Sequence, residues 1–251
     1  MPRAERASRD RPGLSPDEAL PVLRAGEMRV LGLLPEASNY TFLAEVSDGD
    51  RSALAVYKPR RGEMPLWDFP DGTLCNREVA AYVLAEELGW PAVPPTVLRD
   101  GPHGDGAVQL FVAADSAANY FTLQEGGHHR EVFRRIAAFD AVAGNGDRKG
   151  GHCLLDPEGR VWAVDHGLCF SVRPTLRTVI WEFAGQEIPA SMIEDLAHVE
   201  SSLRDGGLRR DLLDLLEPEE VDATADRAAA LAGSGRYPRP GPGRSVPWPP
   251  V

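Results

Sequence analysis

The chain has 251 residues, of which 43% are apolar and 26% are charged, and its formal net charge at pH 7 is −11. A chain of this length and apolar content can bury a sizeable core, and it fits one large domain or two tightly packed lobes. The acidic balance argues against a broad nucleic-acid-binding surface, because such surfaces draw most of their affinity from clustered Lys and Arg. We therefore expect a globular protein with no nucleic-acid partner.

The cysteines and the hydropathy pattern indicate the compartment. Three cysteines without a CxxC pair predict neither a disulfide framework nor a zinc site. Residues 1–13 are Arg-rich but lack the apolar stretch of a secretion signal. No later segment approaches the roughly 20 apolar residues that cross a bilayer. We expect no transmembrane segment and a cytoplasmic location.

The first third of the chain has the pattern of a small antiparallel sheet. Residues 1–26 form an N-terminal segment that we expect to be partly disordered, with a plausible helix start at Ser15. Strand-like runs then follow, separated by polar or Gly-rich turns, and together they predict a sheet of about five strands. The runs are residues 28–34, 41–46, 52–58, 96–99 and 107–112.

One helix interrupts these strands. It begins near Thr73, carries apolar residues at helical spacing and stops at Gly89. We expect its apolar stripe to pack on the sheet. Residues 27–113 therefore read as an N-lobe that contains an antiparallel sheet and one helix.

The pattern becomes mostly helical from Glu131 onward, and residues 114–235 read as a C-lobe. Its first helix ends at Gly144, and two short strands, residues 152–155 and 161–165, follow a Gly-rich loop. Three more helical runs come next. They are residues 192–203, 208–216 and 221–231. Residues 236–251 form a Pro-rich tail that we expect to be flexible, because proline cannot donate to regular hydrogen-bonded structure.

Lys58 and Glu78 are candidates for binding phosphates. Lys58 closes a predicted strand, and Glu78 lies on the helix that follows. An ammonium at a strand end that is held by a helix carboxylate can reach nucleotide phosphates. Taken alone, such a pair is more often a solvated surface contact.

Two polar loops carry the strongest signal. The segment Gly144-Asn145-Gly146-Asp147-Arg148 lies between an apolar helix and a strand, and Val164-Asp165-His166-Gly167 follows the next strand. This spacing places Asp147, His152 and Asp165 at one edge of a small hairpin. The set can supply a carboxylate base and metal ligands to one site.

These loops resemble the catalytic and metal-binding loops of the phosphatidylinositol 3-/4-kinase superfamily, and they look closest to its actinobacterial branch. The resemblance covers most of the chain, from near Leu31 to the helices past Trp181. It implies an α+β bilobal protein-kinase-like fold, with a small antiparallel-sheet N-lobe with one helix and a mostly helical C-lobe. It also implies binding of ATP with Mg²⁺.

The resemblance assigns roles residue by residue. Asp147 matches the catalytic Asp, and Asp165 matches the metal-binding Asp. Lys58 matches the nucleotide Lys, with Glu78 as its helix partner. Residues 108–112 match the hinge that binds adenine, which makes Gln109 and Phe111 cofactor-binding candidates, and Ser38 and Asn39 would cap the phosphates.

Two residues in the first loop have open roles. Arg148 completes the Asp-Arg motif at the catalytic site, where it would either meet an anionic substrate or lock the loop by pairing with an acidic neighbour; we favour the second role. His152 stands five residues after Asp147, where better-known members carry an Asn that ligates the second magnesium. Since Mg²⁺ prefers oxygen ligands, His152 would weaken one metal site, shift the preference toward Mn²⁺, or bind no metal and form hydrogen bonds beneath the loop.

The leading hypothesis is a kinase that transfers phosphate from ATP to a hydroxyl of a lipid, a protein or a small molecule. The net charge of −11 would repel an anionic leaflet, so a lipid acceptor has no priority. Two alternatives stay open: a nucleotide-binding regulatory pseudokinase with weak turnover, and a nucleotidyl transferase that binds ATP in the reversed pose. The sequence does not identify the acceptor or the oligomeric state.

Overall fold

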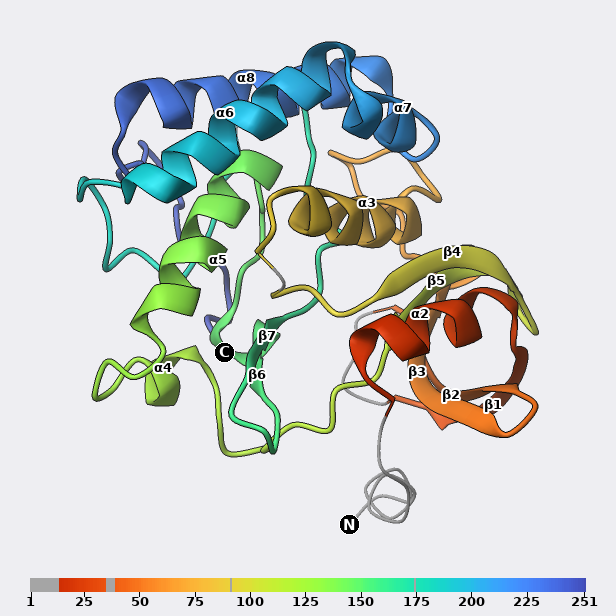
Figure 1. Cartoon of the computed structure of the whole chain (residues 1–251). Coiled ribbons are helices and arrows are strands. Elements are labelled where there is room, and N and C mark those ends of the chain that lie inside the picture. The colour runs from red at the N-terminus through yellow and green to blue at the C-terminus, as the bar shows by residue number, and fades with distance from the viewer. Residues whose placement is uncertain (1–13, 35–38, 91, 174) are drawn as a thin grey trace. The chain divides into compact units, whose positions relative to one another are not determined.

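The computed structural model describes residues 14–34, 39–90, 92–173 and 175–251, which belong to two compact units (Figure 1). The first unit contains the described residues up to Val79 together with Pro94–Ala113, and the second contains Ala80–Val93 and Ala114–Val251. Within the described residues, no helix has both the length and the apolar character needed to span a bilayer.

A five-stranded sheet with the order β1-β2-β3-β5-β4 forms the centre of the first unit, and every neighbouring pair is antiparallel. Each of the predicted strand-like runs is a strand here. On β3, buried residues alternate with partly exposed ones, because one face of the strand lies on the core. The strands are β1 (Glu27–Leu33), β2 (Phe42–Asp48), β3 (Arg51–Pro59), β4 (Thr96–Gly101) and β5 (Gly104–Leu110).

Helix α2 (Pro16–Ala25) covers one face of this sheet and packs against β2, β3, β4 and β5. Ser15 and Glu18 form a capping box that satisfies the first N–H groups of the helix. Val22 and Leu23 are fully buried with Ala44, Val46 and other sheet residues. The apolar face of α2 therefore holds this part of the N-terminal segment on the sheet. Residues 1–13 lie outside the described residues.

The second unit is mostly helical and contains a two-stranded antiparallel sheet in which Cys153 pairs with Ala163. Helix α8 packs along α6 and also contacts α5 (Figure 1). The predicted helices and short strands are confirmed, and a four-residue helix, α4, precedes them without a clear periodic signal. The elements are α4 (Tyr120–Leu123), α5 (Arg130–Ala143), the 3-10 helix η2 (Gly150–His152), β6 (Cys153–Leu155), β7 (Val161–Ala163), α6 (Ala190–Asp205), α7 (Gly207–Leu213) and α8 (Pro218–Ser234).

The composition of the Pro-rich tail, residues 236–251, predicts a flexible segment without regular structure. Beyond Arg236 it contains no helix or strand, but it is attached to the second unit by hydrogen bonds. Tyr237 is 3% exposed, and its N–H and carbonyl pair with Gln186 and Gly185. Proline removes donors but leaves every carbonyl as an acceptor, so such a segment can be held by donors from elsewhere in the fold.

Candidate active site

Lys58 on β3 and Glu78 on helix α3 (Leu74–Glu87) form an ion pair in the first unit, as the sequence predicted. The Glu78 side chain is 3% exposed and the Lys58 side chain is 22% exposed, so the carboxylate is buried while the ammonium keeps access to solvent. A buried carboxylate needs such a partner, because removing a charge from water is expensive. The pair therefore fixes the position of the ammonium.

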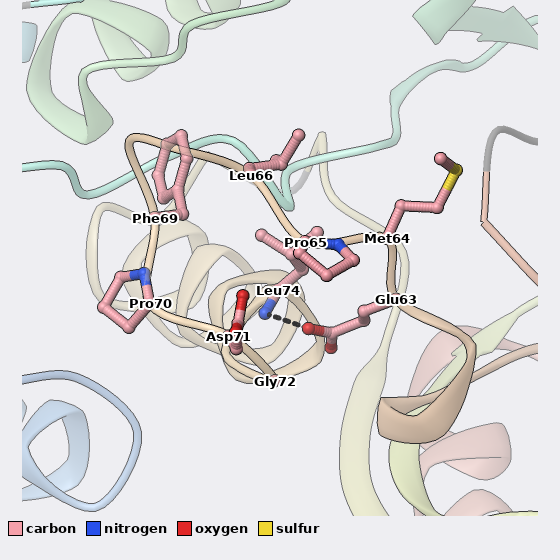
Figure 2. Close-up of a pocket in the computed structure, with 9 residues that line it drawn as sticks. All are labelled: Glu63, Met64, Pro65, Leu66, Phe69, Pro70, Asp71, Gly72 and Leu74. Carbon is pink, nitrogen blue, oxygen red and sulfur yellow. Dashed lines mark hydrogen bonds between the residues drawn. The ribbon is translucent and has the colours of Figure 1, made fainter.

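The N-terminus of α3 is fixed by a second carboxylate. Glu63 accepts hydrogen bonds from the N–H groups of Leu74, at 3.0 Å, and of Cys75, at 2.8 Å. Figure 2 shows the first of these bonds beside a small pocket that the loop before α3 forms. A negative charge at this end of a helix also opposes the positive end of the helix dipole. None of the residues predicted to bind nucleotide lines this pocket.

The predicted phosphate-capping residues lie between β1 and β2. Ser38 is outside the described residues. The Oδ1 atom of Asn39 accepts the Met64 N–H at 2.9 Å, and the neighbouring Tyr40 N–H donates to the Gly62 carbonyl at 3.1 Å. Asn39 therefore ties the β1–β2 connection to the segment after β3, and its role toward phosphate stays a prediction.

The predicted hinge overlaps the end of β5. Gln109 sits on a strand with neighbours on both sides, opposite Val56 and Thr96, and its side chain donates to Thr96 Oγ1 at 2.9 Å. The Phe111 N–H donates to the Leu54 carbonyl at 2.9 Å. The Gln109 side chain and the Phe111 N–H are therefore occupied within the first unit, and the roles of Gln109 and Phe111 toward adenine stay predictions.

Asp147 is held by the residues at the end of α5. Gly144 ends the helix in the left-handed conformation, with φ of 64°, which favours glycine. The buried Asn145 side chain then donates to Asp140 Oδ1 and accepts the Asp147 N–H, both at 2.9 Å. The backbone of Asp147 is thereby fixed to the last turn of α5.

The Asp147 carboxylate has the environment of a proton acceptor. Burial raises its pKa above the ordinary carboxyl value, the charge and hydrogen bond of Lys149 oppose this shift, and the Asp165 charge adds to it. Its Oδ2 lies 3.2 Å from Lys149 Nζ, and its side chain is 26% exposed. A partly accessible carboxylate with a raised pKa is suited to accept a proton from a hydroxyl.

Arg148 is fully buried, and its side chain links the loop of Asp147 to the segment that leads to Asp165. Its guanidinium pairs with Asp140, with Nη2 at 3.0 Å from Oδ1, and donates to the Val164 carbonyl at 2.8 Å. Nη2 also lies 2.7 Å from His166 Nε2. Burial is the largest single effect and lowers the pKa of Arg148, but the charge and hydrogen bond of Asp140, together with the neighbouring Cys153 and Cys169, make the net shift upward. This position suits a residue that locks the loops and not one that touches a substrate.

Asp165 stands at the end of β7 in a strained backbone conformation. Its φ is 62°, a region that non-glycine residues rarely adopt, and its side chain is 53% exposed. The fold therefore stores strain to present this carboxylate outward. Such outliers concentrate at ligand sites, and an exposed carboxylate is a ligand that Mg²⁺ prefers.

His152 contacts Asp165 through one ring nitrogen and accepts a hydrogen bond through the other. Nδ1 accepts the Lys149 N–H at 3.4 Å. Nε2 lies 3.3 Å from Asp165 Oδ2. The geometry favours the hydrogen-bonding alternative for His152 over a metal ligand. Within the described ranges, no three His, Cys, Asp or Glu side chains gather as a ready-made metal cage.

The donor set still fits a magnesium ion. Mg²⁺ is commonly held by one or two carboxylates together with substrate phosphates and water, and a preformed cage is not required. Asp165, with its outward carboxylate, is the first candidate ligand. Asp147 is close enough for its pKa to respond to the Asp165 charge.

The segment after Asp165 pairs with the loop that carries Asp147. The Arg177 N–H donates to the Asn145 carbonyl at 2.9 Å, and the Arg148 N–H donates to the Arg177 carbonyl at 3.0 Å. Arg227 on α8 reinforces this contact, because its guanidinium donates to the Val142 carbonyl at 2.7 Å and the Ser171 carbonyl at 3.0 Å.

Sequence reasoning missed Asp140, Asn145 and Arg227. Asp140 was detectable as a carboxylate among the apolar residues near the end of the α5 sequence, and Asn145 as part of the Gly-rich loop. Arg227 lies 85 positions from Val142, and no local pattern connects them.

Comparison with known proteins identifies relatives of the chain and of its fold. No family model matches. Protein Rv2133c of Mycobacterium tuberculosis is 39% identical over 268 residues, which cover 93% of this chain and 95% of that protein. Among solved structures, the hydra Fam20 protein with sugar superposes with a TM-score of 0.55 at 12% identity, over 87% of each chain. The Golgi casein kinase with Mn and ADP bound superposes with a TM-score of 0.53 at 15% identity, over 87% of this chain and 74% of that one.

The structural likenesses, at these low identities, establish the fold: an α+β kinase-like fold with an antiparallel-sheet lobe and a mostly helical lobe. The identity and coverage of the mycobacterial relative establish the family. The chain belongs to the same family as Protein Rv2133c of Mycobacterium tuberculosis.

Proposed function

We propose that this protein is an ATP-dependent phosphotransferase of the phosphatidylinositol 3-/4-kinase type that phosphorylates a hydroxyl group. The observation that carries the proposal is the pair of fixed carboxylates, Asp147 on the loop after α5 and Asp165 at the end of β7. One has a raised pKa and the other is presented outward by a strained backbone. Phosphoryl transfer requires one carboxylate near the acceptor hydroxyl and another on the metal.

Each site residue then has a task. Lys58, held by Glu78, neutralises the phosphates of ATP, and Asp165 would hold Mg²⁺, which supplies positive charge against the phosphate oxygens. Asp147 takes the proton of the acceptor hydroxyl. The acceptor oxygen forms a bond to the γ-phosphorus, the bond from that phosphorus to the β-phosphate oxygen breaks, and ADP leaves. Arg148 links the two loops through its bonds to Asp140 and to the Val164 carbonyl.

A nucleotide and a divalent metal are also present in one solved protein of this fold, the Golgi casein kinase with Mn and ADP. This supports the use of ATP and a divalent ion here. His152 accepts a hydrogen bond at Nδ1 and lies against the Asp165 carboxylate at Nε2, so we assign the metal to oxygen ligands and expect Mg²⁺ to suffice.

The test measures the mass of products when the purified protein is incubated with ATP, Mg²⁺ or Mn²⁺ and a lysate of its own cells. We expect a product heavier by one phosphate with the wild type and none with Asp147→Asn. Asp211→Asn, an exposed carboxylate on α7, is the matched control and should retain transfer. A product heavier by one nucleoside monophosphate would replace the kinase assignment with nucleotidyl transfer. ATP binding without any transfer would replace it with a regulatory pseudokinase.

Asp165→Asn separates the roles of the two carboxylates. We expect it to weaken metal-dependent ATP binding, whereas Asp147→Asn should leave this binding intact. Wild-type behaviour in both variants would overturn the site assignment.

A further inference from the structure

The tail holds the two loops of the candidate site at two points. Its path begins at the buried Tyr237, whose hydroxyl donates to the Arg134 carbonyl at 3.2 Å. The chain then runs without helix or strand across the second unit, and in Figure 1 the label for its end lies beside β6 and β7. Hydrogen bonds at Ser245 and Pro250 show what it contacts there.

Ser245 fixes the segment that follows Asp165. Its carbonyl accepts two donors, the Thr178 N–H and the Trp181 Nε1–H, each at 3.0 Å. Thr178 also forms the isolated bridge to Arg148 on the catalytic loop. The Ser245 carbonyl thus binds Thr178, the residue that pairs the segment after Asp165 with the loop of Asp147.

Pro250 fixes the catalytic loop itself. Its carbonyl accepts the Gly150 N–H at 2.7 Å, three positions after Asp147 and at the start of η2, which ends at His152. A Cβ atom at Gly150 would lie 2.8 Å from the Phe121 ring and 3.4 Å from the Pro250 carbonyl oxygen. Gly150 is therefore enclosed between α4 and the tail.

The composition of the tail suits this task. Proline-rich chain stays extended and offers carbonyl oxygens without competing N–H donors, so it cannot withdraw into a strand or helix of its own. Between the two anchors, Pro247 is buried while Trp248 is 75% exposed. The Trp248 side chain therefore contributes little to the attachment of the tail. The attachment depends on the backbone carbonyls and on the buried Pro247.

We propose that residues 245–250 form a strap that positions the catalytic loop, with the Pro250 carbonyl holding Gly150 and the Ser245 carbonyl holding Thr178. Its catalytic consequence rests on the proposed function. Displacement of a reacting group by about 1 Å can reduce turnover on the order of 100-fold, so a loop bearing the proton acceptor needs such anchoring. The strap has no contact with a substrate in this assignment; it acts through Asp147 and His152.

Hydrogen exchange of individual backbone amides tests the strap independently of activity. A chain that stops at residue 244 is compared with the full chain and with the control variant Trp248→Ala, which keeps both carbonyls. We expect the Gly150 and Thr178 amides to exchange at least about tenfold faster in the shortened chain and at the original rate in Trp248→Ala, since a lost hydrogen bond of about 1.4 kcal/mol corresponds to tenfold. A synthetic peptide of residues 245–251 should restore protection. Unchanged protection of Gly150 would overturn the strap.

The kinetic arm distinguishes positioning from general destabilisation. In the shortened chain we expect kcat to fall by about 10- to 100-fold, while the KM for ATP changes by less than about twofold.

If the shortened chain does not fold, Pro247→Gly in the full chain replaces it: faster exchange at Gly150 then supports the strap, and unchanged exchange overturns it. A wild type without transfer would overturn the proposed function only, because exchange at Gly150 would still decide the strap.

Discussion

His152 Nε2 lies 3.3 Å from Asp165 Oδ2, and the same imidazole accepts the Lys149 N–H through Nδ1. The histidine therefore links the loop of Asp147 to the carboxylate that we assign to the metal. A residue that orients a metal ligand in this way affects the metal site without binding the ion.

The first prediction concerns the metal preference of His152 variants. We expect His152→Ala to lower turnover by about 10-fold or more, because partners of metal ligands typically contribute 10- to 100-fold. The ratio of rates with Mg²⁺ and Mn²⁺ should stay within about twofold of the wild type, since the ion loses no ligand. Steady-state rates with each metal at saturation measure this ratio. A clear change of the ratio toward Mg²⁺ would instead show that His152 ligates the ion.

The second prediction concerns the pH dependence of transfer. Burial raises the pKa of Asp147 and the charge of Lys149 lowers it. The carboxylate must be ionised to accept a proton, so activity should fall as the pH drops through this raised pKa. Lys149→Met removes the lowering charge and should move the acid limb of kcat/KM to higher pH. Lys149→Arg keeps the charge and should leave the limb in place; an equal shift in both variants would contradict the electrostatic explanation.

The third prediction concerns the buried pair of Arg148 and Asp140. Asp140→Ala leaves a fully buried guanidinium without its carboxylate, which should reduce the free energy of unfolding by about 3–5 kcal/mol. Urea unfolding followed by circular dichroism measures the loss. Arg204 provides the control, because its side chain is 42% exposed and pairs with Glu200 and Asp226. Arg204→Met should change the unfolding free energy by less than about 1 kcal/mol, and a similar loss in both variants would refute the special role of the buried pair.

The fourth prediction concerns coupling between Lys58 and Glu78. If Glu78 acts by holding Lys58 toward the phosphates, then Lys58→Met and Glu78→Gln remove the same interaction. Their effects on ATP affinity should be non-additive, with the double variant close to Lys58→Met alone. Calorimetric titration of ATP with each variant gives the cycle. Glu45→Gln, which breaks the exposed pair with Arg29 on the same sheet, should leave ATP affinity unchanged. Additive losses of ATP affinity in the Lys58 and Glu78 variants would show that the two residues act independently.

Much of this protein is encoded in short stretches of its sequence. Alternation of apolar and polar residues predicts β3 with Lys58 at its end, and helical spacing predicts α5 and the position at which it ends. The Gly-rich loop and the Asp at the end of β7 follow directly from such local signals. These features depend on neighbours within a turn or a strand, so the sequence alone determined the order of elements and predicted the two carboxylates as candidates.

The tertiary structure alone decided which of these residues touch. It buried Arg148 against Asp140, placed His152 against Asp165, and brought Arg227 on α8 to the end of α5. It also attached the Pro-rich tail, whose composition predicts a flexible segment, to Gly150 by a hydrogen bond. Each contact pairs a donor with an acceptor that no shared helix or strand brings together. These contacts depend on how the buried surfaces pack, and the periodicity of the sequence does not predict that packing.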